Sequence, residues 1–164
     1  MIKMTTNFGV IEIELFTEQA PNTTANFTQY VNDGFFDGLI FHRVIPNFMI
    51  QGGGFEPGMK QKSPKAPIQN EADNGLKNER GTLSMARTND PHSATSQFFI
   101  SVKDNAFLDF KSKDASGWGY TVFAKVVSGM DVVDSIAQTP TGNSGGHGDV
   151  PLEDVVIEKA EVVQ

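Results

Sequence analysis

The sequence predicts an all-β fold, a closed or nearly closed β-barrel of eight strands with two helices. Eight runs have strand-like apolar patterns, and only two segments have helical spacing. Long interruptions at residues 52–78, 103–119 and 139–151 carry many of the Gly and Pro residues. A barrel is favoured because closure removes exposed strand edges. A two-sheet sandwich is the alternative that this pattern leaves open.

The strands follow one another from the N-terminus. Residues 2–4 and 10–15 form a hairpin, in which apolar side chains at 11, 13 and 15 alternate with Glu12 and Glu14, so that one face is exposed. Six more strands are expected at residues 39–45, 48–51, 81–86, 97–102, 120–127 and 155–163.

The two helices are expected at residues 22–33 and 130–137. Asn22 or Thr23 is the expected N-cap of the first helix, positions 24, 27 and 31 share one face, and Gly34 ends it. The second helix carries an apolar face at positions 132, 133 and 136 and stops before Pro140.

Length and charge limit the classes of protein and partner. The 164 residues fit one domain, residues 1–164. Thirteen Lys and Arg against 20 Asp and Glu give a net charge of -7, so we expect no nucleic-acid or membrane partner. We also expect a monomer. The N-terminus lacks a signal-peptide stretch, and no run approaches the ~18 apolar residues of a membrane span. We therefore expect a cytoplasmic protein.

The usual catalytic motifs are missing. No cysteine is present, and His42, His92 and His147 lie in unrelated segments without metal-ligand spacing. Two glycine-rich runs, residues 52–54 and 142–146, lack the ending of a phosphate-binding loop and are interpreted as flexible turns. No serine-hydrolase elbow occurs. We expect neither a metal nor a cofactor.

Polar residues inside apolar strands point to a ligand pocket. Arg43 should share one strand face with Phe41 and Ile45, and Gln51 should share one with Met49. In the strand at 97–102, positions 97 and 99 face one way while 98 and 100 face the other. Apolar surfaces with a few polar groups are typical of a binding pocket. The alternative is that Arg43 reaches solvent or pairs with a carboxylate.

Four blocks in this region resemble the signature sequences of the cyclophilins, which are peptidyl-prolyl cis-trans isomerases. They are residues 41–46 (FHRVIP), 48–53 (FMIQGG), 81–86 (GTLSMA) and 96–100 (SQFFI). The likeness covers essentially the whole chain and is greatest for the bacterial cytosolic branch. It implies a closed eight-stranded antiparallel barrel capped by two helices, and isomerisation of X-Pro bonds in client proteins without a covalent step.

The resemblance also implies roles for individual residues. Arg43 would donate a hydrogen bond to the prolyl nitrogen, and Gln51 would support it and reach the substrate carbonyl. The proline ring would enter an apolar pocket, and the backbone beside it would pair with the extended peptide. The pocket residues are Phe48, Met49, Phe99 and Leu108, with Phe107 at the rim; the pairing stretch is Ala86, Arg87 and Thr88, with Gln97 beside it.

Three positions depart from many eukaryotic members of the family. Phe107 stands where they have a Trp whose indole N–H helps to hold cyclosporin, so we expect weak binding of that inhibitor. Tyr120 stands where they have a His. Arg87 replaces a small polar residue, which should alter substrate preference more than chemistry. Trp118 lies in a later loop, and we do not expect it to replace that Trp.

Other functional hypotheses for the same residues stay open. A proline-peptide binding module or holdase chaperone with incidental isomerase activity would use the same groove. A carbohydrate-binding barrel is disfavoured because it would need exposed Trp or Tyr, and the chain has one Trp and two Tyr. His42 is assigned a structural role, and the core is expected to contain Phe27, Phe98, Ile100 and Phe123.

Overall fold

A curled antiparallel sheet of eight strands dominates the computed structural model, which describes residues 1–163. The strand order is β12-β1-β2-β9-β7-β8-β4-β3, so the eight predicted strands are all found in one sheet. Their bounds are β1 Ile2–Thr6, β2 Gly9–Leu15, β3 Arg43–Ile45, β4 Met49–Gly52, β7 Thr82–Met85, β8 Phe98–Ser101, β9 Val122–Ser128 and β12 Ile157–Val162.

The barrel is only partly closed, so the expectation of a closed barrel was too strong. The sheet ends at β3 and β12, which do not pair with each other. Backbone bonds from the segment before β3 bridge the gap: the Phe41 amide donates to Val155 (2.9 Å) and the Ile157 amide donates to Leu39 (2.8 Å). The strand predicted at 39–45 is therefore split, because its first half pairs near β12 and its second half pairs with β4.

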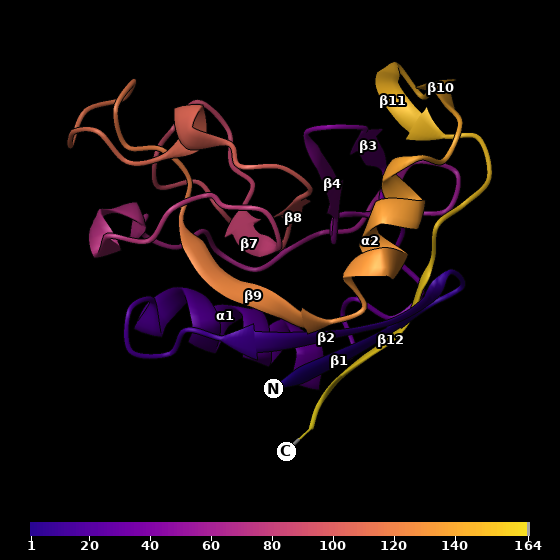
Figure 1. The fold of residues 1–164 in the computed structure, drawn as a ribbon, viewed down its shortest axis with the longest axis horizontal. Helices are drawn as coiled ribbons and strands as arrows, with labels where there is room; N and C mark the ends of the chain where they lie inside the picture. Colours follow the sequence, from indigo (N-terminus) through magenta and orange to yellow (C-terminus); the bar gives the residue numbers. More distant parts are fainter. Residues whose placement is uncertain (164) are drawn as a thin grey trace.

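Two α-helices accompany the sheet, α1 at Pro21–Asn32 and α2 at Met130–Ala137 (Figure 1). The predicted N-cap of α1 was wrong, because Pro21 occupies the first turn and Ala20 is the N-cap, with no side-chain bond. Glu71 takes over the capping function: its carboxylate accepts bonds from the Thr23 amide (2.8 Å) and hydroxyl (2.7 Å). The bounds predicted for α2 are confirmed.

Two small hairpins occupy interruptions that sequence patterns left as loops. They are β5 Phe55–Glu56 with β6 Lys60–Gln61, and β10 Thr141–Ser144 with β11 His147–Pro151. The second contacts β3 through β11, follows α2 in the chain (Figure 1) and turns at Gly145 and Gly146, both with positive φ. Two 3₁₀ turns, η1 Ala72–Asn74 and η2 Ala106–Leu108, complete the list of elements.

The main core lies between the inner face of the sheet and the two helices, α1 and α2. The Phe27 ring of α1 packs against Phe36, Phe98 and Phe123 with ring centroids 5.0–5.4 Å apart. The predicted core positions 27, 98, 100 and 123 are all buried, as expected. Phe41 also lies in this core rather than beside Arg43, because regular alternation begins only where β3 does.

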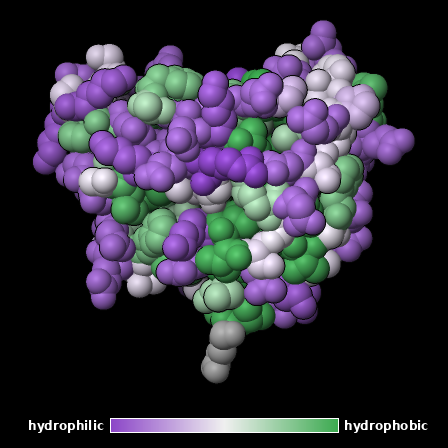
Figure 2. All heavy atoms as spheres, viewed as in Figure 1, coloured by the Kyte–Doolittle hydropathy of each residue, from purple (hydrophilic) through white to green (hydrophobic). Residues whose placement is uncertain are grey.

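Hydrophilic side chains cover most of the upper part of the face seen in Figure 2, whereas hydrophobic ones gather below, around β1 and β2. Phe8, in the turn between β1 and β2, and Val10, on β2, are exposed apolar side chains. Within residues 1–163, no helix has the length and apolarity needed to cross a membrane.

The cap on α1 gives a first testable prediction. Replacing Glu71 with Ala leaves N–H groups in the first turn of the helix without their acceptor and removes a negative charge from its N-terminus. We expect the free energy of unfolding to fall by about 1 to 2 kcal/mol, measured by urea denaturation. Glu18→Ala, an exposed position before the helix, should change it by less than about 0.5 kcal/mol. Equal effects of the two substitutions would contradict the capping role.

Candidate active-site groove

Three neighbouring strands place a row of side chains on the outer face of the sheet. Arg43 on β3 lies opposite Gln51 on β4, and Gln51 lies opposite Phe99 on β8. The neighbours of these residues along each strand, Val44, Ile50 and Ile100, point into the main core. Strand alternation therefore carries the site residues to the other face, as predicted for positions 51 and 99.

This row forms one side of a cavity of about 130 Å³. The opposite side comes from η2 and from the segments at residues 86–87 and 120. Nine of the twelve residues singled out from the sequence line the cavity together: Arg43, Phe48, Met49, Gln51, Ala86, Arg87, Phe99, Leu108 and Tyr120.

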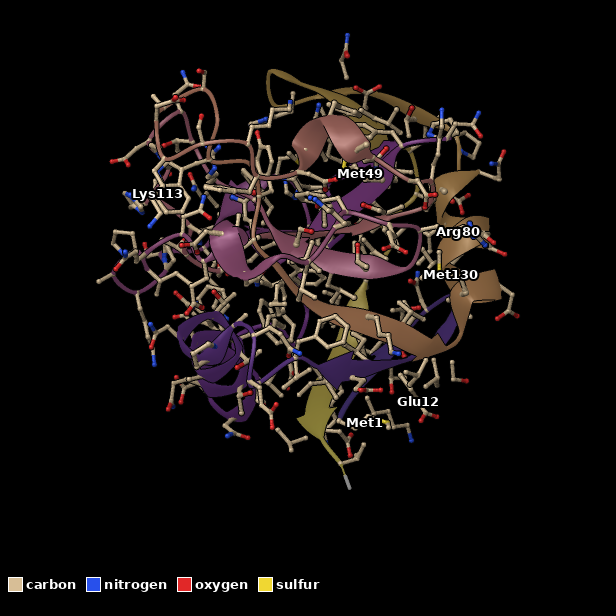
Figure 3. The ribbon with its side chains drawn as sticks, turned by 60° about the vertical axis from the view of Figure 1, so that its left-hand side comes forward. Met1, Glu12, Met49, Arg80, Lys113 and Met130 are labelled. Carbon is tan, nitrogen blue, oxygen red and sulfur yellow. The ribbon has the colours of Figure 1, made fainter. Side chains whose placement is uncertain are left out.

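One end of the cavity is apolar. Met49, Phe99 and Leu108 form a small buried cluster of their own, separate from the main core, and Met49 lies beneath η2 in Figure 3. The Tyr120 ring meets Phe99 edge-on at 5.7 Å. Phe107 is 64% exposed and packs on Phe48 at 5.7 Å, so it lies at the rim, as expected.

The loop at residues 105–120 contains η2 and covers the apolar end of the cavity, and hydrogen bonds hold it against the sheet. The buried Asn105 donates from Nδ2 to the Phe48 carbonyl at 3.0 Å, and the Tyr120 amide donates to the Leu108 carbonyl at 3.0 Å. The first bond ties the loop to the start of β4, and the second ties its two ends together. These two hydrogen bonds thus preform the apolar end of the cavity.

The other end of the cavity is a chain of polar side chains. Gln51 donates from Nε2 to Gln97 Oε1 at 3.0 Å, and its Oε1 accepts a long bond of 3.5 Å from Arg43 Nη1. The Arg43 side chain is exposed, and one such bond leaves most of its N–H groups for a ligand.

Three glycines, residues 52–54, follow Gln51 and pack closely against their neighbours. Residues 52–54 are buried, which corrects the interpretation of this run as a flexible turn. A Cβ on Gly54 would lie 2.5 Å from Cγ of Gln97, and one on Gly52 would lie 2.9 Å from the Ile40 carbonyl. Side chains at these positions would therefore displace either Gln97 or the neighbouring backbone.

Arg87 is fixed at the boundary of the cavity. Its Nε donates to the Gly119 carbonyl (3.0 Å), its Nη1 donates to the Thr88 carbonyl (2.9 Å), and its guanidinium lies 4.5 Å from the centre of the Tyr120 ring. Stacking and two hydrogen bonds leave this side chain little rotational freedom.

The three remaining predicted residues lie next to the cavity. Thr88 and Gln97 line an adjoining cavity of about 340 Å³, and Phe107 lines one on the far side of Tyr120. Three further residues of the adjoining cavity were missed: Gln61, Ser93 and Thr95. Gln61 belongs to the two-residue strand β6, which is too short to show a pattern, and Ser93 and Thr95 lie in an irregular segment. Trp118 is buried against His92 and Phe110 instead of lining the groove.

His42 lies behind Arg43 and is buried against Phe55, with ring centroids 4.4 Å apart. Its Nδ1 has no hydrogen-bond partner among residues 1–163. Burial, aided by His147 and Arg43, lowers the pKa of His42 from 6.5 to about 4. The ring is therefore neutral at physiological pH.

The lining of the cavity defines what it can do. It holds two arginines, one amide and one phenol beside apolar side chains, and no carboxylate. In the described part of the chain, no group of three or more His, Cys, Asp or Glu is placed to hold a metal ion. The arrangement can enclose a small apolar ring and direct hydrogen-bond donors at the polar group attached to it.

Comparisons with known proteins agree on one family. Residues 1–162 match the family described as cyclophilin type peptidyl-prolyl cis-trans isomerase/CLD. The chain is 62% identical to peptidyl-prolyl cis-trans isomerase B of Escherichia coli K12 over 162 residues, which cover 99% of each chain. It is 60% identical to peptidyl-prolyl cis-trans isomerase cyp18 of Streptomyces antibioticus, over 99% of this chain and 98% of that one.

A solved structure has the same fold. The cyclophilin type peptidyl-prolyl cis-trans isomerase of Cryptosporidium parvum, crystallised in the presence of the dipeptide Ala-Pro, superposes with a TM-score of 0.84. The two sequences are 28% identical, and the match covers 99% of this chain and 98% of that one.

The buried imidazole predicts a pH dependence of stability. The pKa of His42 is about 4 in the folded chain against 6.5 as the ordinary value, so the unfolded chain binds a proton first as the pH falls. Protonation thus favours unfolding between pH 6.5 and 4, and stability rises with pH across that window. This one group should lower the free energy of unfolding by about 3 kcal/mol between pH 7 and 4.

The measurement is urea denaturation of the wild type and of His42→Phe at several pH values. Groups other than His42 titrate in both proteins, so the difference between their free energies isolates the imidazole. We expect that difference to shift by about 3 kcal/mol in favour of the variant on going from pH 7 to 4. A difference that stays constant with pH would show that His42 is not held neutral.

Proposed function

The chain belongs to the cyclophilin-type peptidyl-prolyl cis-trans isomerases, and we propose that it isomerises X-Pro bonds in the groove between Arg43 and Leu108. The observation that carries this proposal is the cavity itself, which pairs an apolar end with an arginine donor and contains no carboxylate. The related Cryptosporidium parvum structure, determined in the presence of Ala-Pro, supports proline-containing peptides as the ligand class.

The reaction needs no bond to break. Amide resonance imposes a barrier of roughly 18 to 20 kcal/mol on rotation about the peptide bond. Rotation becomes easier when the prolyl nitrogen loses resonance with the carbonyl, because the nitrogen then becomes pyramidal and can accept a hydrogen bond. A catalyst must therefore bind the twisted amide better than either planar form.

Arg43 is the proposed donor to that nitrogen. Its guanidinium is exposed at the polar end of the cavity and engages Gln51 through one long bond of 3.5 Å, so several N–H groups face the groove. The bond to the nitrogen forms only once the amide twists, which makes it selective for the transition state. One preorganised donor of this kind is typically worth about 3 to 4 kcal/mol.

Gln51 is proposed to align the arginine and to reach the substrate carbonyl. Its amide is oriented from behind, because Gln97 Oε1 accepts from its Nε2 at 3.0 Å and leaves its Oε1 toward Arg43. The close packing of Gln97 over Gly54 supports this arrangement.

The proline ring is proposed to fill the apolar end of the cavity. Met49, Phe99 and Leu108 are buried there, and their side chains have no N–H or O–H donor that a ring carbon would leave unsatisfied. The backbone at Ala86, Arg87 and Thr88 is proposed to pair with the extended peptide next to the proline. Anchoring the ring and the backbone leaves the prolyl amide as the part of the substrate that rotates.

The proposal extends to the substrates of the protein in the cell and to an inhibitor. Unfolded or folded client proteins with accessible X-Pro bonds are the proposed natural substrates. The monomeric state and the cytoplasmic location stay predictions from the sequence. Weak cyclosporin binding is also proposed, because a phenyl ring at position 107 has no N–H to donate.

Substitution of Arg43 tests the mechanism. We expect Arg43→Ala to lower kcat/KM for a short X-Pro peptide by about two to three decades, because the donor to the twisted nitrogen is lost. Arg43→Lys should also lose most of the activity, since a point charge does not replace a planar fork. NMR exchange spectroscopy measures the isomerisation rate, and titration of the same peptide measures binding.

Peptide binding should be largely kept in Arg43→Ala, because the apolar end of the cavity is intact. Turnover by the variant at the wild-type rate would overturn the assignment of Arg43. It would favour a binding module or holdase whose isomerase activity does not depend on this residue.

Position 107 tests the proposed weakness of cyclosporin binding. Phe107 is exposed at the rim, so an indole fits there without repacking the core. We expect Phe107→Trp to tighten cyclosporin binding about tenfold through the added N–H donor, measured by inhibition of peptide isomerisation. Phe107→Leu, which adds no donor, should bind no more tightly than the wild type. A similar gain in both variants would show that the N–H is not the cause.

A further inference from the structure

The groove is a cationic region on an acidic protein. The chain has 20 Asp and Glu against 13 Lys and Arg. The proline cavity nevertheless contains Arg43 and Arg87 and no carboxylate, and the adjoining cavity of about 340 Å³ contains Arg87 and no carboxylate. The uneven distribution of charge favours a substrate segment that carries negative charge.

Arg87 is the cation left free for such a segment. The proposed function commits Arg43 to the prolyl nitrogen, whereas Arg87 lies on the boundary between the two cavities. Its Nε and Nη1 bond to backbone carbonyls of Gly119 and Thr88, and neither of these partners carries a negative charge. Its positive charge is therefore not neutralised by these contacts, and its Nη2 is left to meet a ligand.

The side chain is also held in place before any ligand binds. Its guanidinium stacks at 4.5 Å on the Tyr120 ring, and two carbonyls fix its orientation. A preorganised arginine loses little further rotational freedom on binding a carboxylate, so more of the interaction appears as affinity.

The rest of the adjoining cavity suits a polar acceptor. Gln61, Thr95 and Gln97 supply amide and hydroxyl groups around its wall. Carboxylates lie outside this lining: Asp109 lies beyond Tyr120, where its Oδ1 accepts from Asn78, and Asp149 lies beyond Arg43. Asp90 follows Thr88 in the turn beside the cavity, and its Oδ1 accepts from the His92 amide at 2.9 Å. The cavity next to the 86–88 segment thus offers donors to an anion with no carboxylate in its own lining.

We propose that Arg87 is a specificity-determining residue that selects substrates with an acidic side chain in the stretch preceding X-Pro. The inference rests on the proposed function, in which the backbone at 86–88 pairs with the extended peptide. Alternate side chains of such a peptide face this wall of the groove. A glutamate among them meets Arg87, whereas a lysine at the same place is repelled.

The expected selectivity is modest because Arg87 is only half-buried. Attraction of Glu and repulsion of Lys should each change kcat/KM by about threefold relative to Gln, within the range of partly exposed ion pairs. Together they separate Glu from Lys peptides by about tenfold. Screening should reduce that ratio at high salt.

The test uses peptides that differ only at the second or third position before proline, with Glu, Gln or Lys there. NMR exchange spectroscopy measures kcat/KM without a coupling protease, whose own preference would distort the ratio. We expect the wild type to favour Glu over Lys by about tenfold at one of these positions in low salt. In Arg87→Gln, the ratio should fall below twofold.

Arg80→Gln is the matched control, because it removes the same charge from a residue that pairs with Asp134 and lies against α2 (Figure 3). The tenfold ratio should persist in this variant. The ratio is internal to each protein, so a general loss of activity in Arg87→Gln does not hide the result.

Two results would overturn the inference while leaving the isomerase function intact. One is equal turnover of Glu and Lys peptides at both positions by the wild type. The other is a preference that survives in Arg87→Gln or disappears equally in Arg80→Gln. Failure of the wild type to accelerate any of the peptides would instead overturn the proposed function, and this inference with it.

Discussion

The site depends on the two-residue alternation of β3, β4 and β8. Along β4, Met49 and Gln51 face the groove while Ile50 enters the main core. Along β8, Phe99 faces the groove while Phe98 and Ile100 enter the core. A slip of one residue would exchange every member of the two sets, so the same burial that stabilises the core holds the catalytic face outward.

Close contacts then turn this face into a groove. The loop that covers it cannot lift away without breaking the bond from the buried Asn105 side chain to the Phe48 carbonyl. On the polar side, Gly54 has no side chain and so leaves room for Gln97, which in turn orients Gln51. The apolar and polar ends are thus built by different means, one by loop attachment and the other by the absence of a side chain.

The sequence predicted what short-range pattern controls, together with what the family resemblance carried. Alternation placed Gln51 on one strand face with Met49 and set Phe99 apart from Phe98 and Ile100, and helical spacing placed α2. The family resemblance joined the two strand faces in one pocket. Interactions between distant residues were not visible: Glu71 caps a helix that begins 50 positions earlier in the chain, and the stretch at 39–45 divides between two partners. Phe41 was wrongly placed on the face of Arg43. The prediction extended strand alternation back to residue 41, whereas β3 begins only at Arg43.

The charges around Arg43 explain why a cation can act here without a titrating partner. His42 precedes it in the chain and would repel it if protonated, but burial keeps the pKa of His42 near 4. Arg43 itself contributes to that low pKa, so the two residues favour the state in which only the arginine is charged. Guanidinium groups as a class are permanently charged donors in proteins. A hydrogen-bond donor of constant charge suits a reaction in which the amide must twist but no proton needs to be transferred, and the neutral imidazole behind it preserves that condition.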